Sequence, residues 1–287
     1  MLEFNAWSNL FAYAFMRNAF IAGTLVAVVA GVMGYFVVLR RLAFAGHALA
    51  HIGFAGATGA VLLDMNLLVG LAGFTTGAGI AMGVLGDKIR GRDVAIGTVL
   101  ALTMGLGNLF LTLSTKLAGE ATSILFGDLL AISWAQVQLT LAFAVATLLV
   151  LAAIYRPLLF ASVDPDVAET RGVPVRLLGV VFMILLALTV SQSVQVVGVL
   201  LIFSLLITPA ATAQLLTARP AVAIAYSVGL AVVSVWLGLL LACQIPWPPS
   251  AFITMVSFAL YLGARLLAPR SGSPWWRTAG SDLQTAP

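Results

Sequence analysis

Residues 18–39 read NAFIAGTLVAVVAGVMGYFVVL, and the run ends at Arg40 and Arg41. About 20 consecutive apolar residues form a helix that is long enough to cross a hydrocarbon core of about 30 Å. Comparable runs follow along nearly the whole chain, at roughly 43–63, 67–86, 94–114, 134–154, 176–192, 195–217, 221–243 and 249–268. The sequence therefore predicts an all-α, polytopic membrane protein with about eight or nine transmembrane helices.

The composition supports a single membrane domain. Of the 287 residues, 62% are hydrophobic and 8% are charged, whereas soluble domains carry about 25% charged residues. We assign residues 17–270 to this domain. Residues 1–16 carry an aromatic stripe and are expected to lie in the membrane interface. The polar tail 271–287 is expected to be disordered on the cytoplasmic side.

The basic residues indicate how the chain is oriented. If the spans alternate, the side opposite the N-terminus receives Arg40, Arg41, Lys88, Arg90, Arg92, Arg156, Arg171, Arg176, Arg219, Arg265, Arg270 and Arg277. The other side receives only Arg17 and Lys116. This asymmetry predicts an N-terminus outside the cell and a C-terminus in the cytoplasm. It also explains the formal net charge of +4 without a nucleic-acid partner.

The longest connection on the predicted cytoplasmic side, residues 155–176, carries the residue types that begin and end a short helix. Asp164 suits the N-cap and Pro165 the first helical position, whereas Gly172 can end the helix. So short a helix is unstable alone and needs a surface to dock on. That surface is either the membrane with neighbouring loops, or a cytoplasmic partner whose basic groups face the acidic residues of the helix.

The sequence predicts a conduit without enzymatic activity. The phosphate-binding pattern GxxxxGK[ST] is absent. Carboxylates in mid-span are the usual mark of ion coupling, and of the ten acidic residues only Asp128 can lie inside a span. Asp128 either caps a helix terminus or belongs to a pathway or gate. The energy for transport is therefore expected to come from another subunit.

The two histidines of the chain, His47 and His51, lie in the stretch FAGHALAHIGFAG. Residues four apart on a helix point the same way, so both imidazoles can converge on one metal ion. The alternative is that they form hydrogen bonds across helices. A metalloprotease site requires a glutamate after the first histidine, and Ala48 stands there. Haem ligation by two histidines requires opposite faces of the macrocycle, which one helix face cannot supply.

Several stretches together resemble the membrane-spanning permeases of ABC importers for zinc, manganese and iron. They are VVLRRLAFAGHALAHIGFAGA (37–57), DVAIGTVLAL (93–102), LFGDLLAIS (125–133), DPDVAETRGV (164–173) and VQVVGVLLIFSLLITPAATA (194–213). The last also resembles a helix of vitamin and iron-chelate importers, which implies the fold of type II ABC importers. The resemblance implies cytoplasmic ATPase subunits, an extracytoplasmic metal-binding protein and a second permease copy in the bacterial cytoplasmic membrane.

The resemblance also implies roles for individual residues. The ATPase-coupling helix corresponds here to Asp164, Pro165, Asp166, Glu169, Arg171 and Gly172. In the family, aspartate is common at the position of His47, and histidine at that of His51, in a pair associated with the metal site. Because imidazole nitrogen favours zinc and manganese favours oxygen, we expect zinc as cargo and the zinc-uptake branch as the nearest relatives. No intrinsic cofactor is expected. The alternatives are manganese or ferrous iron, an iron chelate, or a membrane protein without a transport role.

Overall fold

A computed structural model describes residues 13–85, 92–113, 127, 129–245 and 247–267 of the chain. All regular elements in these ranges are helices, as predicted. They are α2 (Ala14–Leu39), α3 (Ala43–Leu62), α4 (Leu67–Leu85), α5 (Arg92–Leu113), α7 (Trp134–Val163), α8 (Pro165–Thr170), α9 (Val175–Leu216), α10 (Pro220–Ala242) and α11 (Pro249–Leu267). The predicted interfacial segment 1–16, apart from its last residues, and the predicted tail 271–287 lie outside the described residues.

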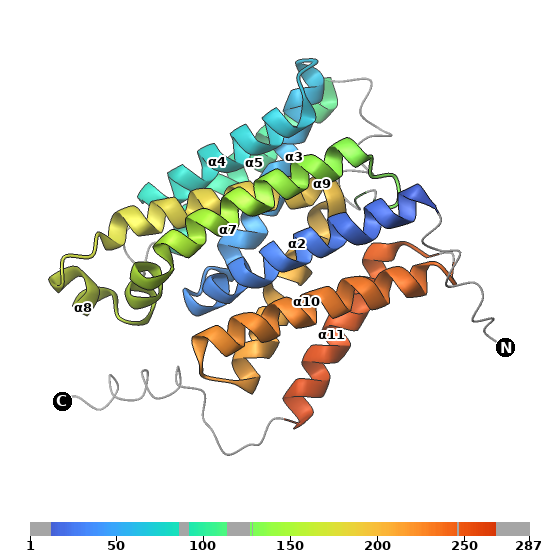
Figure 1. The fold of residues 1–287 in the computed structure, drawn as a ribbon. Helices are drawn as coiled ribbons and strands as arrows, with labels where there is room; N and C mark the ends of the chain where they lie inside the picture. Colours follow the sequence, from blue (N-terminus) through green and yellow to red (C-terminus); the bar gives the residue numbers. More distant parts are fainter. Residues whose placement is uncertain (1–12, 86–91, 114–126, 128, 246, 268–287) are drawn as a thin grey trace.

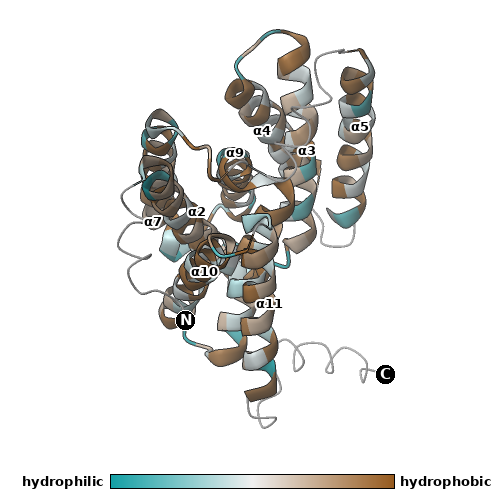
Figure 2. Cartoon of the chain, turned by 90° about the vertical axis from the view of Figure 1, so that its right-hand side faces the viewer, coloured by the Kyte–Doolittle hydropathy of each residue, from teal (hydrophilic) through white to brown (hydrophobic). Residues whose placement is uncertain are grey.

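The bundle is built around α9, which packs against α2, α3, α4, α7, α10 and α11 (Figure 1). Viewed along the bundle, α3, α4 and α5 form a group on one side of α9, and α2 and α7 lie on the other side (Figure 2). Helices α10 and α11 pack against each other and against α9. Helices α4, α5, α7, α10 and α11 are mostly exposed and strongly apolar, as expected of surfaces in contact with lipid.

Helix α9 changes direction at Gly198, whose backbone has φ 82° and ψ 164°. Before this residue α9 runs antiparallel to α2, because Phe182 meets Phe36 while Gln192 lies beside Leu25. After Gly198, α9 runs parallel to α2. Gly34 packs so closely against α9 that an added methyl group would overlap the carbonyl of Leu206. Residues of α9 beyond Leu206 lie beside the last residues of α2. Only glycine adopts such a backbone readily. The two halves of α9 therefore correspond to the two predicted runs 176–192 and 195–217.

Seven of the described helices are long and apolar enough to cross a membrane, with both halves of α9 counted as one. Helix α3 is not among them, although its 20 residues suffice in length. Its two histidines and four glycines make it less apolar than the other spans, and its interior position tolerates this composition. Small residues such as Ala45, Ala48, Ala55 and Ala57 are fully buried against neighbouring helices, so α3 has little need of a lipid-facing apolar surface. The expected eight or nine helices agree roughly with this arrangement.

The basic residues of the described helices gather at one end of the bundle. Arg41 and Arg265 line one cavity together with Leu215, near the end of α9. Arg40 lines a second cavity together with Gly179, near the start of α9. Helix α8 and the beginning of α10 lie on this side as well (Figure 1). Arg17, by contrast, is in the first turn of α2, at the opposite end. The structure thus reproduces the alternation on which the predicted charge asymmetry depends.

The sequence predicted a polar connection over residues 155–176, but most of these residues are helical. Helix α7 continues through Pro157 to Val163. The extra turns are held because Leu158 and Ala161 are buried, at 0% and 3% exposure. Burial of this apolar face offsets the hydrogen bond that proline removes. Only Asp164 separates α7 from α8.

Candidate metal site and its surroundings

The histidine pair lies on α3, with His51 close to the middle of the helix. The two rings lie on the same side, and their centroids are 4.6 Å apart at an interplanar angle of 78°. Spacing of four residues brings them together, as the sequence predicted. Two imidazoles this close can bind one ion with modest rotation of the rings.

The side of α3 that carries the histidines is incompletely covered. His47, His51 and Phe54 are partly exposed and Phe44 is 42% exposed, whereas the opposite side of the helix is buried. We call these four residues the histidine face. The second half of α9 borders it, because the ring of Phe203 lies 4.7 Å from that of His47. Phe203 was not predicted to belong to the site, because it stands in an apolar run whose sequence does not distinguish it from its neighbours.

Neither imidazole forms a hydrogen bond with another residue in the part of the chain that the structure describes. The alternative of hydrogen bonding across helices is therefore not seen there. The same residues contain no group of three or more His, Cys, Asp and Glu side chains arranged to hold a metal ion. Within these ranges the histidine face thus offers two nitrogen ligands and no carboxylate or thiolate beside them.

The predicted short helix forms as α8, with the predicted ends. The Asp164 carboxylate accepts a hydrogen bond of 3.0 Å from the backbone N–H of Val167, and Pro165 occupies the first turn. Gly172 follows the helix with a φ of 79°, a conformation that favours glycine. Asp166, Glu169 and Arg171 are exposed, and only Ala168 of this helix is buried. The acidic side chains are thus available to a partner.

Asp128 lies outside the described residues, so its role as cap or gate stays a prediction. Its neighbour Gly127 has a φ of 72° and packs directly against the backbone of Val197 and Gly198. The N-cap of α7 is Ser133, which exchanges hydrogen bonds with Gln136 in a capping box. The segment before α7 is therefore held against the point where α9 reverses.

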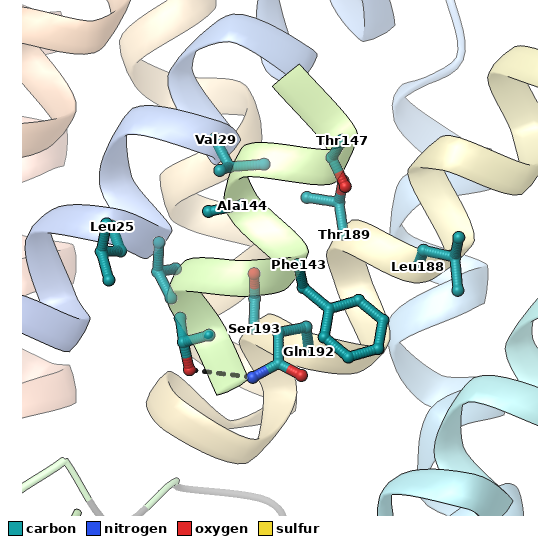
Figure 3. Close-up of a pocket in the computed structure, with 11 residues that line it drawn as sticks. Leu25, Val29, Phe143, Ala144, Thr147, Leu188, Thr189, Gln192 and Ser193 are labelled. Atoms are coloured by element: carbon teal, nitrogen blue, oxygen red, sulfur yellow. Dashed lines mark hydrogen bonds between the residues drawn. The ribbon is translucent and has the colours of Figure 1, made fainter. Parts of the chain in front are cut away.

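A second cluster of polar side chains, which was not predicted from the sequence, lies between α2, α7 and α9 (Figure 3). We call it the glutamine pocket, with Thr140, Thr147, Thr189, Gln192 and Ser193 as its polar residues. All five are at most 5% exposed. Gln192 donates a hydrogen bond of 2.8 Å to the Thr140 hydroxyl, while its Oε1 has no partner in the described structure. The cavity is about 10 Å³, near the minimum that holds one water molecule.

The glutamine pocket is too small for a hydrated metal ion, and it carries no charged ligand. The sequence did contain a signal for this pocket. Polar residues recur at helical spacing at 140–147 and 189–193, within two otherwise apolar runs. Because the sequence SQS at 191–193 resembles a break between spans, it obscured this interior role.

Comparison with known proteins identifies the family and the fold of the chain. The profile of the ABC 3 transport family matches residues 12–268. The manganese transport system membrane protein MntC of Listeria innocua is 32% identical over 265 residues, which cover 92% of this chain and 94% of that protein. The structure of PsaBC from Streptococcus pneumoniae in complex with Fab matches with a TM-score of 0.82 and 27% identity, over 95% of this chain and 98% of that one.

A second solved structure tests the fold alone. An inward-facing ABC transporter of the metal-chelate type matches with a TM-score of 0.70 at 14% identity, over 93% of this chain and 90% of that one. The predicted type II importer fold is confirmed by these two likenesses.

Proposed function

Because this chain belongs to the ABC 3 transport family and is a membrane permease of the metal-importer type, we propose that it carries a divalent first-row metal ion into the cell, with manganese as the first candidate. The observation that carries this proposal is the histidine face. Two imidazoles lie 4.6 Å apart on a helix inside the membrane bundle, on a side that the rest of the chain leaves partly open. Ionisable residues in membrane helices usually serve a pathway.

Two observations favour different metals as the transported ion. The relative MntC is named for manganese, which favours manganese and gives no support to the zinc prediction made from sequence. Zinc is the second candidate, because two imidazoles and no described carboxylate suit a borderline metal better than a hard one. A site that binds weakly suits a permease, since the ion must leave as well as enter.

Two ligands are too few for either metal, and a second copy of the chain can complete the set. Zinc takes about four ligands and manganese takes more. A two-fold axis beside the histidine face would bring four imidazoles around one ion and would cover the exposed Phe44 ring. We therefore place the passage between two permease copies, with His47 and His51 as its metal ligands and Asp128 as a pathway or gate residue.

The direction of transport and the source of energy follow from the charged residues. The basic end of the bundle is assigned to the cytoplasm by the positive-inside rule, which places the N-terminus outside. Helix α8 would then fit a groove on a cytoplasmic ATPase, through Asp164, Asp166 and Glu169 and the turn at Arg171 and Gly172. An extracytoplasmic binding protein would deliver the ion at the other end. Residues 17–270 are the permease domain of this assembly.

The test is metal uptake by cells that depend on this chain, with radioactive manganese and zinc in competition. We expect uptake of manganese by the wild type and a loss of at least about tenfold in the H47N/H51N variant, since even the loss of a residue that supports a metal ligand costs about 10–100-fold. Equal amounts of permease in the membrane, measured by immunoblot, are the control. Unchanged uptake of both metals in the double variant would refute the proposal.

A further inference from the structure

A cavity of about 300 Å³ opens at the basic end of the bundle, between the ends of α2, α9 and α11. We call it the basic cavity. Its polar lining consists of Arg41, Gln214, Tyr261 and Arg265, and Val38 and Leu215 are among its apolar lining residues. None of its described lining residues is acidic. Two guanidinium groups therefore face a shared space that has no carboxylate among its described lining residues.

The backbone at Arg41 is held in a conformation that arginine rarely adopts. Its φ is 56°, in the left-handed region that glycine and asparagine favour. This conformation separates two neighbouring arginines. The Arg40 guanidinium lies 5.3 Å from the ring of Phe182, inside the bundle, whereas Arg41 lines the basic cavity. An arginine at a position where glycine would be less strained indicates that the side chain has a role there.

The other polar groups of the basic cavity are held in place by hydrogen bonds. The Arg265 guanidinium donates to the Tyr261 hydroxyl, one turn earlier on α11, at 3.2 Å. The Gln214 amide donates to the backbone carbonyl of Tyr35 at 3.0 Å. A guanidinium group fixed as that of Arg265 is can bind two phosphate oxygens and loses little freedom on binding.

We infer that the basic cavity lies at the depth of the lipid headgroups, because its two arginines stand at the ends of membrane-spanning helices. Arg41 follows the last residue of α2 by two positions, and Arg265 precedes the last residue of α11 by two. Beside the cavity on α11, Leu262 and Leu266 expose 44% and 76% of their surfaces. A ligand with an anionic head and apolar chains would satisfy both surfaces at once.

We propose that the basic cavity binds the phosphate headgroup of an anionic phospholipid from the surrounding leaflet. Arg41 and Arg265 contact the phosphate, Gln214 and Tyr261 border it, and the acyl chains lie along Leu262 and Leu266. Basic pockets between transmembrane helices on the cytoplasmic side commonly hold such headgroups. The proposal is independent of the transported metal and of the histidine face.

The test is lipid binding to the full-length permease in detergent, measured by native mass spectrometry without metal or ATP. Phosphatidylglycerol and phosphatidylcholine with identical acyl chains are the probes. We expect phosphatidylglycerol to bind more tightly and the R41Q/R265Q variant to lose about thirtyfold in its affinity, from the contribution of two basic groups near the surface. The matched control is R156Q/R219Q, which removes the same charge from exposed positions on the basic side but outside the cavity, and should lose less than about threefold.

Three results would overturn the proposal. The first is an equal loss of affinity in both double variants, which would mean diffuse attraction to the basic end. The second is displacement of phosphatidylglycerol by an equal concentration of glycerol 3-phosphate, which would make a soluble phosphate the ligand. If R41Q/R265Q does not fold, R41K/R265K keeps the charge. Failure of that variant to prefer phosphatidylglycerol over phosphatidylcholine is the third contradicting result.

Discussion

The histidine face and the glutamine pocket both place polar side chains inside an apolar helix bundle, but only one of them is closed. Gln192 is 5% exposed and bonded to Thr140 across two helices. His47 and His51 are partly exposed, and within the described residues they form no hydrogen bond. The pocket has room for about one water molecule, whereas the residues of the face are partly exposed.

This difference separates a packing role from a binding role. A buried polar group that is bonded to its neighbours stabilises one arrangement of helices. A pair of titratable rings left uncovered costs free energy in the membrane unless an ion, water or a second chain completes it. Under the proposed function, the comparison predicts a transport role for the histidine face and a helix-packing role for the glutamine pocket.

The largest contrast is expected from a matched pair of substitutions, His51→Leu and Gln192→Leu. Each replaces a polar residue with leucine. We expect metal uptake to fall by at least about tenfold with His51→Leu, because a ligand is lost and even the loss of a residue that supports a ligand costs about 10–100-fold. Gln192→Leu should change uptake by less than about twofold, and its stability little, because it also removes the Oε1 atom that lacks a partner. Comparable losses of uptake in both variants would break the distinction.

A smaller effect is expected from His47→Asp, which exchanges a nitrogen ligand for oxygen. Manganese prefers oxygen ligands, so the ratio of manganese to zinc uptake should rise, by about tenfold if the exchange is worth about 1.4 kcal/mol. Competitive uptake of the two metals measures this ratio. An unchanged ratio would mean that His47 does not contact the ion, although His51 still could.

The smallest effect is expected from Thr140→Val, which removes the hydroxyl that accepts the Gln192 hydrogen bond. Bonds between helices in membranes contribute about 0.5–1.5 kcal/mol, so the free energy of unfolding should fall by that amount. Titration with sodium dodecyl sulfate, followed by circular dichroism, measures it. Uptake at equal protein levels should stay within about twofold, and a loss comparable with that of His51→Leu would give the pocket a transport role.

Much of the fold could be predicted because apolar runs of helix length are a strong local signal. The boundaries were less certain, since tertiary packing decided them. Leu158 buries enough apolar surface to carry α7 past Pro157. The turn in α9 falls at Gly198, several residues after the polar stretch that resembled a break, because Gln192 and Ser193 are buried in the glutamine pocket.

The candidate site could be predicted only in part. Spacing placed His47 and His51 on one side of a helix, but it could not show that this side stays uncovered or that Phe203 lies beside it. Phe203 is distant in sequence and reaches His47 only because α9 reverses at Gly198. Ligand chemistry alone favoured zinc, and the manganese name of a relative changed that order.

The central claim is that the imidazoles of His47 and His51 hold the transported ion. The most direct measurement is the metal content of the purified permease after dialysis against manganese or zinc, wild type beside H47A/H51A, by inductively coupled plasma mass spectrometry. We predict one bound ion for two chains of wild type and none in the variant. An ion retained at the same stoichiometry by a folded H47A/H51A variant would contradict the claim.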